Sequence, residues 1–143
     1  AMHRNFEGYA DPTAGEAVSK VMREYKKKQR AVWQRRYDLM HRKKVYVASP
    51  FAGDIKSNMA HAIGYCRYVI ARNGQPIASH LLYPQILDDS NPIEREIGLM
   101  FGLALLELCD EVWCFGVMSE GMKLEISVAK KMGKTIRYIK EVG

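Results

Sequence analysis

The sequence lacks any apolar run long enough to cross a membrane. Its longest apolar stretches fall far short of the ~18 consecutive residues that a membrane-spanning helix needs. The first of them follows a long charged segment, which differs from the layout of a secretory signal peptide. We therefore expect a cytoplasmic protein without a membrane partner.

Cysteine is scarce, and the metal-binding residue types are poorly spaced for a shared site. Cys66, Cys109 and Cys114 form no CxxC pair, so we expect reduced, buried thiols rather than disulfides. The four histidines have no metal-ligand spacing with one another or with the cysteines. We therefore expect neither a structural zinc nor another metal site.

Two common nucleotide-binding loops are missing as well. The sequence contains no GxGxxG segment and no GxxxxGK[ST] segment. Neither a standard dinucleotide site nor a P-loop is therefore supported by the sequence.

Basic charge, by contrast, is abundant and lies near the N-terminus. The 143 residues carry a net charge of +6. Residues 1–44 hold twelve Lys or Arg and five Asp or Glu, which gives +7, whereas residues 45–143 hold ten and eleven, which gives −1. We therefore divide the chain into an N-terminal segment, residues 1–43, and a second domain, residues 44–143.

A basic amphipathic helix is predicted in the N-terminal segment, from near Thr13 to about Met40. Its imperfect apolar stripe consists of Val18, Val21, Met22, Tyr25, Val32 and Trp33. Its basic side consists of Lys26, Lys27, Lys28, Arg30, Arg35 and Arg36. The helix either packs its stripe on the domain or a second subunit, or it contacts nucleic acid. A basic helix without base-reading residues is weak evidence for nucleic acid.

Beyond Lys44, strand and helix patterns alternate with short connections. Strands are predicted at 45–49, 76–79, 111–116 and 135–139. Helices are predicted between them, the first capped by Ser57, the second by Asn91 before Pro92, and the third starting at Ser119. Such alternation is typical of an α/β protein with a parallel sheet. We expect a Rossmann-like (flavodoxin-like) three-layer domain with four or five parallel strands.

Three segments are expected to converge on one crevice, because ligands of such sheets bind at the carboxyl ends of the strands. They are SPFAGD (49–54), SHLLYP (79–84) and GVMSEGM (116–122). We expect Glu125, in the first turns of the last helix, to face the same crevice.

Glu125 is unexpected because it lies on the side that the last helix must bury. Met122, Ile126 and Ala129 fall at i, i+4 and i+7 and form a core-facing stripe, which also contains Glu125. Two interpretations stay open at this point. Glu125 is either a functional carboxylate or a buried group paired with an Arg or Lys of a neighbouring element.

Together these segments resemble the nucleoside 2-deoxyribosyltransferase superfamily, including its nucleotide N-glycosidase branch and small phage-type relatives. The resemblance covers about residues 44–140. VYVASPFAGD (45–54) is similar to the family's first strand and loop, in which a tyrosine in the position of Tyr46 lines the site. GMKLEISVAKKMGK (121–134) is similar to the nucleophile helix. Its glutamate stands nine residues before the lysine of a closing Gly-Lys, as Glu125 stands before Lys134, and four after a glycine, here Gly121.

The resemblance implies a reaction at the sugar of a nucleoside or nucleotide. Glu125 would attack the anomeric carbon, the base would leave, and a glycosyl ester would form for transfer to another base or to water. Tyr46 would position Glu125, and no metal or organic cofactor is implied. The substrate-binding residues that the resemblance suggests are Ser49, Phe51, Gly53, Asp54, His80, Ser119, Gly121 and Met122.

One position departs from the family pattern. Members usually carry an aspartate eight residues before the aspartate that opens the third strand. Here the second aspartate is Asp110, and the first position holds Gly102. The missing carboxylate normally helps orient the sugar or base and handle the leaving-group proton. The candidates to replace it are Asp88, Asp89, Glu94 and Glu96.

Two residues bear on the choice of substrate. Ser119 stands six residues before Glu125, where the family's nucleoside transferases tend to have an aspartate and its nucleotide-hydrolysing branch a serine. A serine at a helix N-terminus favours a 5′-phosphate that an aspartate would repel. Ser119 is equally well explained as a plain N-cap. His80 matches a histidine of the nucleotide-hydrolysing relatives, or is a loop residue without a role.

Three functions follow, in decreasing order of support. The first is an N-glycosidase or deoxyribosyltransferase that acts on a nucleoside 5′-monophosphate or nucleoside. The second is a protein that binds or sequesters a nucleotide or an ADP-ribose-like signal without cleaving it, which Gly102 favours. The third is a nucleic-acid-associated accessory protein acting through the basic helix. We also expect a homo-oligomer, most simply a dimer, to which the N-terminal helix contributes.

Overall fold

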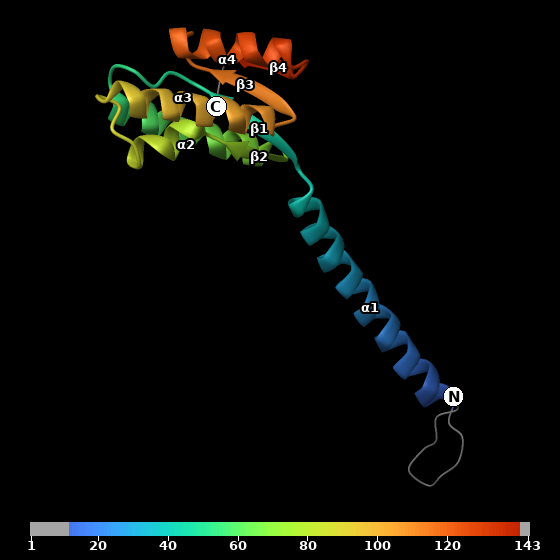
Figure 1. The fold of residues 1–143 in the computed structure, drawn as a ribbon. Coiled ribbons are helices and arrows are strands. Elements are labelled where there is room, and N and C mark those ends of the chain that lie inside the picture. The colour runs from blue at the N-terminus through green and yellow to red at the C-terminus, as the bar shows by residue number, and fades with distance from the viewer. Residues whose placement is uncertain (1–11, 141–143) are drawn as a thin grey trace. The chain divides into compact units, whose positions relative to one another are not determined.

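The computed structural model of the protein describes residues 12–140, and the chain divides into two compact units between His41 and Arg42 (Figure 1). The described part of the first unit is one helix, α1, Pro12–Met40, which confirms the predicted N-terminal helix. Because α1 is the only element among the described residues of that unit, none of them outside α1 covers its apolar stripe.

The second unit contains a four-stranded parallel sheet in the order β2-β1-β3-β4. The strands are β1, Lys43–Ala48, β2, Gly74–Ile77, β3, Glu111–Phe115, and β4, Thr135–Ile139. The helices that connect them are α2, Ile55–Ala71, α3, Pro92–Glu107, and α4, Glu120–Lys131. This confirms the α/β class and the parallel sheet predicted from the alternating pattern.

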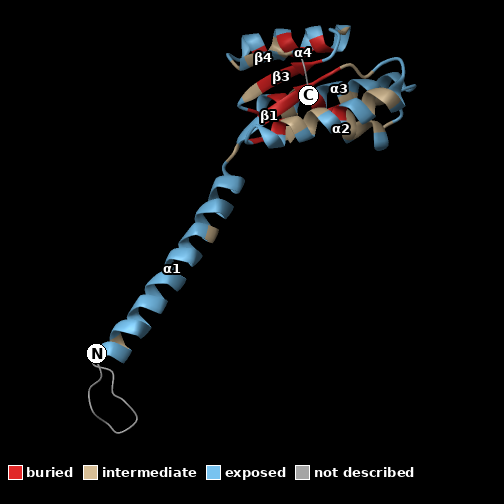
Figure 2. Cartoon of the chain, turned by 180° about the vertical axis from the view of Figure 1, so that it is seen from behind, coloured by how far each residue is buried: buried red, intermediate tan, exposed pale blue. Residues whose placement is uncertain are grey.

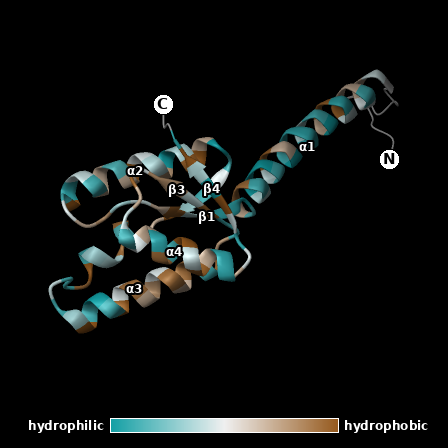
Figure 3. Cartoon of the chain, turned by 90° about the horizontal axis from the view of Figure 1, so that it is seen from above, coloured by the Kyte–Doolittle hydropathy of each residue, from teal (hydrophilic) through white to brown (hydrophobic). Residues whose placement is uncertain are grey.

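The helices cover both faces of the sheet, so the domain has three layers. One core cluster joins α2 to the sheet and consists of Val45, Val47, Val69, Trp113 and Phe115. A second cluster joins α3 and α4 to the other face and consists of Tyr46, Ala48, Leu106, Cys109, Val112, Cys114, Met122, Ile126 and Ala129. Figure 3 shows α2 on one side of the strands and α3 and α4 on the other. Strands β1 and β3 are buried on both faces (Figure 2), which explains their continuous apolar sequences.

The order of the strands positions the site. The chain leaves β1 toward β2 through α2, then returns across β1 to β3 through α3, so the direction of winding reverses beside β1. In doubly wound sheets such a reversal leaves a crevice at the carboxyl ends of the central strands. In the crossover from β2 to β3, the short helices η1, Ser79–Leu81, and η2, Tyr83–Gln85, precede α3.

Several predicted boundaries were wrong, and strand β1 begins at Lys43 rather than at residue 45. The N-cap of α2 is Asp54, whose carboxylate accepts a hydrogen bond from the backbone N–H of Ser57 at 3.1 Å, so Ser57 lies inside the helix. Both residue types are good caps, and spacing alone does not distinguish them. Strand β2 begins two residues earlier than predicted, at Gly74, and Ser79 with His80 belongs to η1.

The other caps follow the sequence signals. Asn91 accepts from the backbone N–H groups of Ile93 at 2.9 Å and Glu94 at 3.3 Å, as predicted for α3. Ser119 is the N-cap of α4 and accepts from the backbone N–H of Met122 at 3.3 Å. These caps fix where α3 and α4 begin, and both beginnings lie near the crevice.

No helix among residues 12–140 is long and apolar enough to span a bilayer. The three cysteines, two buried and one half-buried, are free thiols.

Gly74 gives a direct test of the packing between α2 and the sheet. A Cβ on Gly74 would lie 2.8 Å from Val69 Cγ1 and 3.1 Å from Val45 Cγ2. We expect Gly74→Ala to lower the free energy of unfolding by about 1–3 kcal/mol, because both valines are fully buried and have no room to move. Urea unfolding followed by circular dichroism measures the change.

Gly64, inside α2, is the matched control, because a Cβ there meets nothing within 4 Å. Gly64→Ala should raise the free energy of unfolding by about 1 kcal/mol through helix propensity. If both variants shifted it in the same direction, this account of the α2 packing would be wrong.

Candidate functional site

A cavity of about 240 Å³ opens at the crevice and lies below the usual 300–1,000 Å³ of ligand pockets. Residues from β1, the loop after it, the η1–α3 segment, α3 and α4 line the cavity. They are Tyr46, Phe51, Ser79, His80, Tyr83, Pro84, Leu87, Asp89, Glu94, Arg95, Gly98, Leu99, Gly102, Leu103, Gly121 and Glu125. Its size suits one small organic molecule, and most of its walls are apolar or aromatic.

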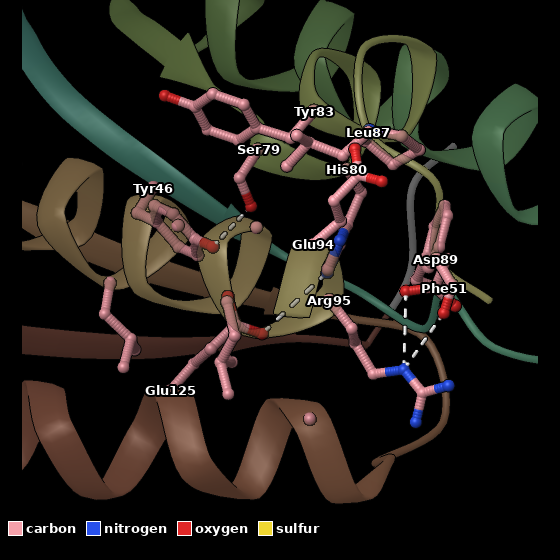
Figure 4. Close-up of a pocket in the computed structure, with 16 residues that line it drawn as sticks. Tyr46, Phe51, Ser79, His80, Tyr83, Leu87, Asp89, Glu94, Arg95 and Glu125 are labelled. Atoms are coloured by element: carbon pink, nitrogen blue, oxygen red, sulfur yellow. Dashed lines mark hydrogen bonds and ion pairs between the residues drawn. The ribbon is translucent and has the colours of Figure 1, made fainter. Parts of the chain in front are cut away.

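Glu125 is the most unusual group in this pocket. Its residue is only 4 % exposed, and neither carboxylate oxygen has a hydrogen-bond partner among the described residues. Burial raises the pKa of the Glu125 carboxyl to about 7, while the nearby Tyr46 hydroxyl partly opposes that rise. Figure 4 shows the side chain rising from α4 toward Tyr46 and His80. The carboxyl is therefore dry, and near neutral pH both its charged and its neutral forms are populated.

No Lys or Arg among the described residues forms an ion pair with this carboxylate. Among residues 12–140, the basic side chain next to Glu125 is His80, whose Nε2 lies 4.0 Å from Glu125 Oε1. Burial lowers the pKa of His80, so the imidazole is mostly neutral near pH 7. The Arg or Lys partner that one interpretation required is not found in the described part of the chain.

Tyr46 and Ser79 form a buried hydroxyl pair beside Glu125. The two hydroxyl oxygens are 2.8 Å apart, and either can donate. The pKa of Tyr46 is raised well above its usual value, first by burial and then by the charge of Glu125, so the phenol stays neutral. A neutral phenol remains available to donate a hydrogen bond.

Gly102 is explained by this hydroxyl pair. A Cβ at position 102 would lie 3.2 Å from Ser79 Oγ and 3.5 Å from Tyr46 Oη. A longer side chain there, such as an aspartate, would displace the pair. The Ser79 hydroxyl thus lies next to position 102, where the family pattern has an aspartate.

Phe51 and His80 form an aromatic wall of the pocket. Their rings stack with centroids 5.0 Å apart and planes inclined by 13°. Asn58 Nδ2 holds the Phe51 loop by donating to the carbonyl oxygens of Phe51 at 3.0 Å and Ala52 at 3.1 Å. The wall is therefore fixed both by stacking and by the first turn of α2.

The far end of the pocket from Tyr46 is polar (Figure 4). There Arg95 Nε donates to the carbonyl oxygen of Asp89 at 3.1 Å and lies 3.9 Å from Asp89 Oδ1. Glu94 Oε1 accepts from the backbone N–H of Asp88 at 3.4 Å. Of the four carboxylates considered as replacements at Gly102, Asp89 and Glu94 line the pocket, whereas Asp88 and Glu96 do not.

The other expected site residues are divided. Tyr46, Phe51, His80, Gly121 and Glu125 meet in the pocket. The rest lie outside its lining. Met122 is buried in the core, Asp54 caps α2, Gly53 is exposed, Ser119 caps α4, and Ser49 is buried with its Oγ unpartnered.

Several lining residues were not anticipated from the sequence. Ser79 lies in the segment SHLLYP (79–84), which was expected at the crevice, but it was not singled out as a site residue. The residues that α3 and the loop before it contribute have no recognisable motif, because their positions depend on how α3 crosses the sheet. Arg95 is the most consequential of them. No group of three or more His, Cys, Asp or Glu among residues 12–140 is arranged to hold a metal ion.

Comparisons with known proteins agree with this architecture. A solved 2-deoxyribosyltransferase from Bacillus psychrosaccharolyticus, characterised as a biocatalyst for the synthesis of antiviral and antitumoral nucleosides, superposes with a TM-score of 0.55 at 15 % identity. The match covers 66 % of this chain and 70 % of that one. No curated protein sequence matches. The resemblance inferred from the sequence is thus confirmed as a shared fold.

Residues 43–139 match the family described as a domain of unknown function (DUF7768). That span contains the whole sheet, the three helices around it and every residue that lines the pocket. The chain therefore belongs to the DUF7768 family, and its α/β domain has the fold of a 2-deoxyribosyltransferase.

Proposed function

We propose that this protein cleaves the base–sugar bond of a nucleoside 5′-monophosphate or nucleoside, as an N-glycosidase or deoxyribosyltransferase. The observation that carries the proposal is Glu125, a buried carboxylate without a cation partner that faces a cavity of small-molecule size. Structural glutamates are almost never fully buried unless they are paired. The shared fold supports the choice of substrate class.

The proposed reaction has two steps at the anomeric carbon. A Glu125 oxygen bonds to C1′ while the C1′–N bond breaks, and the electron pair leaves with the base, which takes a proton from water at the pocket mouth. Water or a second base then attacks C1′, which frees the Glu125 carboxylate and completes hydrolysis or transfer. A carboxylate that water does not solvate is the more reactive nucleophile. The neutral Tyr46 hydroxyl positions it.

The 5′ end of the substrate is proposed to lie at the beginning of α4. Gly121 lines the pocket there, and a Cβ on it would meet nothing within 4 Å, so the space is open. The backbone N–H groups of the first helical turn and the helix dipole favour a phosphate at that end. Ser119 and the loop Ser49–Gly53 flank this space in the proposal.

A second candidate is a protein of the same fold that binds a nucleotide without cleaving it. Gly102 favours it, because the hydroxyl pair Tyr46–Ser79 offers no second carboxylate beside Glu125. A pocket of about 240 Å³ suits a mononucleotide better than a larger ADP-ribose-like molecule. Binding of a mononucleotide without release of its base would support this second function and refute cleavage.

We further propose that the protein is a homo-oligomer. α3 exposes a group of apolar residues, and Figure 3 shows much of the helix brown. The group includes Ile93, Met100, Phe101, Ala104 and Leu108. A large exposed apolar patch on a protein surface often marks an interface with another protein. Together with the stripe of α1, this group on α3 is expected to pack against a second copy.

Glu125→Gln should abolish base release while the protein still folds and binds its ligand. The amide has nearly the same shape but is a far poorer nucleophile. Chromatography of nucleosides and nucleoside monophosphates incubated with each variant measures released base. Turnover close to wild type in Glu125→Gln would show that Glu125 is not the nucleophile.

The same variant separates a functional carboxylate from a structural ion pair. Because burial raises the Glu125 pKa from 4.5 to about 7, the folded protein binds this proton more tightly than the unfolded chain does. The wild type should therefore lose about 2–3 kcal/mol of stability, relative to Glu125→Gln, between about pH 5 and about pH 8. A variant destabilised equally at both pH values would instead indicate a cation partner.

Nucleoside 5′-monophosphates should bind more tightly than the corresponding nucleosides. Ser119→Asp should reverse this preference, because it places a negative charge against the phosphate. Ser119→Ala is the control: loss of the cap costs about 1 kcal/mol of stability without reversing the order. Calorimetric titration measures both affinities, and equal or weaker binding of the monophosphates by the wild type would contradict the proposal.

Light scattering should show an oligomer at tens of micromolar. We expect Trp33→Glu in α1 and Met100→Glu in α3 each to shift the protein toward monomer, because each charge would be buried against the second copy. A monomeric wild type would refute the assembly. If only one variant dissociates the oligomer, the other helix is not part of the interface.

A further inference from the structure

The proposed reaction leaves three polar groups of the pocket without a role. They are Asp89, Glu94 and Arg95, at the end of the pocket opposite Tyr46 (Figure 4). Arg95 Nε donates a hydrogen bond to Asp89, and the two Nη atoms of Arg95 have no partner among residues 12–140. Its guanidinium is thus held by one edge, and the donors on its other edge are free to bind a ligand.

The charge of this end of the pocket argues against a phosphate there. Arg95 is the one Lys or Arg in the described lining, and Asp89 and Glu94 outnumber it. Glu125 adds further negative charge when ionised. A doubly charged phosphate would therefore meet net repulsion, whereas a neutral molecule with both donors and acceptors would not.

The walls beside these groups fit a planar ring. Leu87 and Leu99 are among the apolar residues that line the pocket, and Phe51 with His80 forms the stacked aromatic wall. Aromatic and aliphatic surfaces of this kind bind the faces of a base, and polar groups at the rim read its edge. If Glu125 holds the sugar, the base extends toward the rim.

The donors and acceptors at the rim match one kind of base. An arginine fork pairs with two adjacent acceptors, such as O6 and N7 of a 6-oxopurine. Carboxylates accept from N–H groups, such as N1–H and the 2-amino group of guanine. Adenine instead presents its N6 donor group to the arginine donors. We propose that Asp89, Glu94 and Arg95 form a base-reading subsite for guanine-type purines, an inference that rests on the proposed function.

Calorimetric titration of the full-length protein tests this subsite with four probes: 2′-deoxyguanosine, 2′-deoxyinosine, 2′-deoxyadenosine and 2-deoxyribose 5-phosphate. We expect 2′-deoxyguanosine to bind most tightly, 2′-deoxyinosine next and 2′-deoxyadenosine about tenfold or more weaker than the first, the loss of one bidentate pair. Equal affinities for the three purine nucleosides would overturn the proposal.

Arg95→Ala should weaken 2′-deoxyguanosine binding about tenfold and remove the preference over 2′-deoxyadenosine. Arg67→Ala is the matched control, because Arg67 is exposed on α2, on the other face of the sheet, and should change neither. If Arg95→Ala instead weakened 2-deoxyribose 5-phosphate and left the purine order intact, Arg95 would be a phosphate ligand and the subsite would be refuted.

Chromatography of the same samples separates this inference from the proposed reaction. A purine preference that depends on Arg95, without base released from the nucleosides or from their 5′-monophosphates, would support the subsite and refute cleavage. Base release that shows neither a purine preference nor a dependence on Arg95 would support cleavage and refute the subsite. Absence of binding by the three nucleosides and by their 5′-monophosphates would refute both.

Discussion

The burial of Glu125, with no Lys or Arg partner in the described part of the chain, is the constraint on which the rest of the site depends. Burial raises the pKa of Glu125 from 4.5 to about 7, so the ionised carboxylate lowers the free energy of unfolding by about 3 kcal/mol. Other interactions of the fold must offset this loss. The core of α4 supplies such interactions, because Met122, Ile126 and Ala129 bury the helix against the sheet on either side of the carboxylate. Because the ionised Glu125 lowers stability, its presence is more readily explained by a functional role than by a contribution to folding.

The surrounding residues can be understood from that constraint. A Lys or Arg beside Glu125 would lower its pKa and occupy one of its oxygens, and the described neighbours are instead neutral donors, Tyr46 and His80. Gly102 then makes room for the Ser79–Tyr46 hydroxyl pair. The other carboxylates of the pocket, Asp89 and Glu94, lie at its far end together with Arg95. The arrangement separates a buried carboxylate from a polar rim.

Sequence reasoning succeeded where the signal is local. Short residue patterns along the chain predict the alternating strands and helices. They also predict the caps Asn91 and Ser119 and the position of Glu125 on a buried stripe. The cap of α2 was assigned wrongly because Asp54 and Ser57 are both good caps and only the folded backbone selects one. The lining contributed by α3 was not predictable, since it depends on how the helix crosses the sheet. The Ser79–Tyr46 contact likewise joins residues 33 positions apart.

The central claim is that the Glu125 carboxylate bonds to the sugar. The most direct measurement is mass spectrometry of peptides from the protein after it has been mixed with nucleoside 5′-monophosphates and nucleosides and quenched in acid. The account predicts one modified peptide, the one that contains Glu125, heavier by the mass of the substrate less its free base. Base release with no adduct on Glu125, or an adduct on another residue, would contradict it.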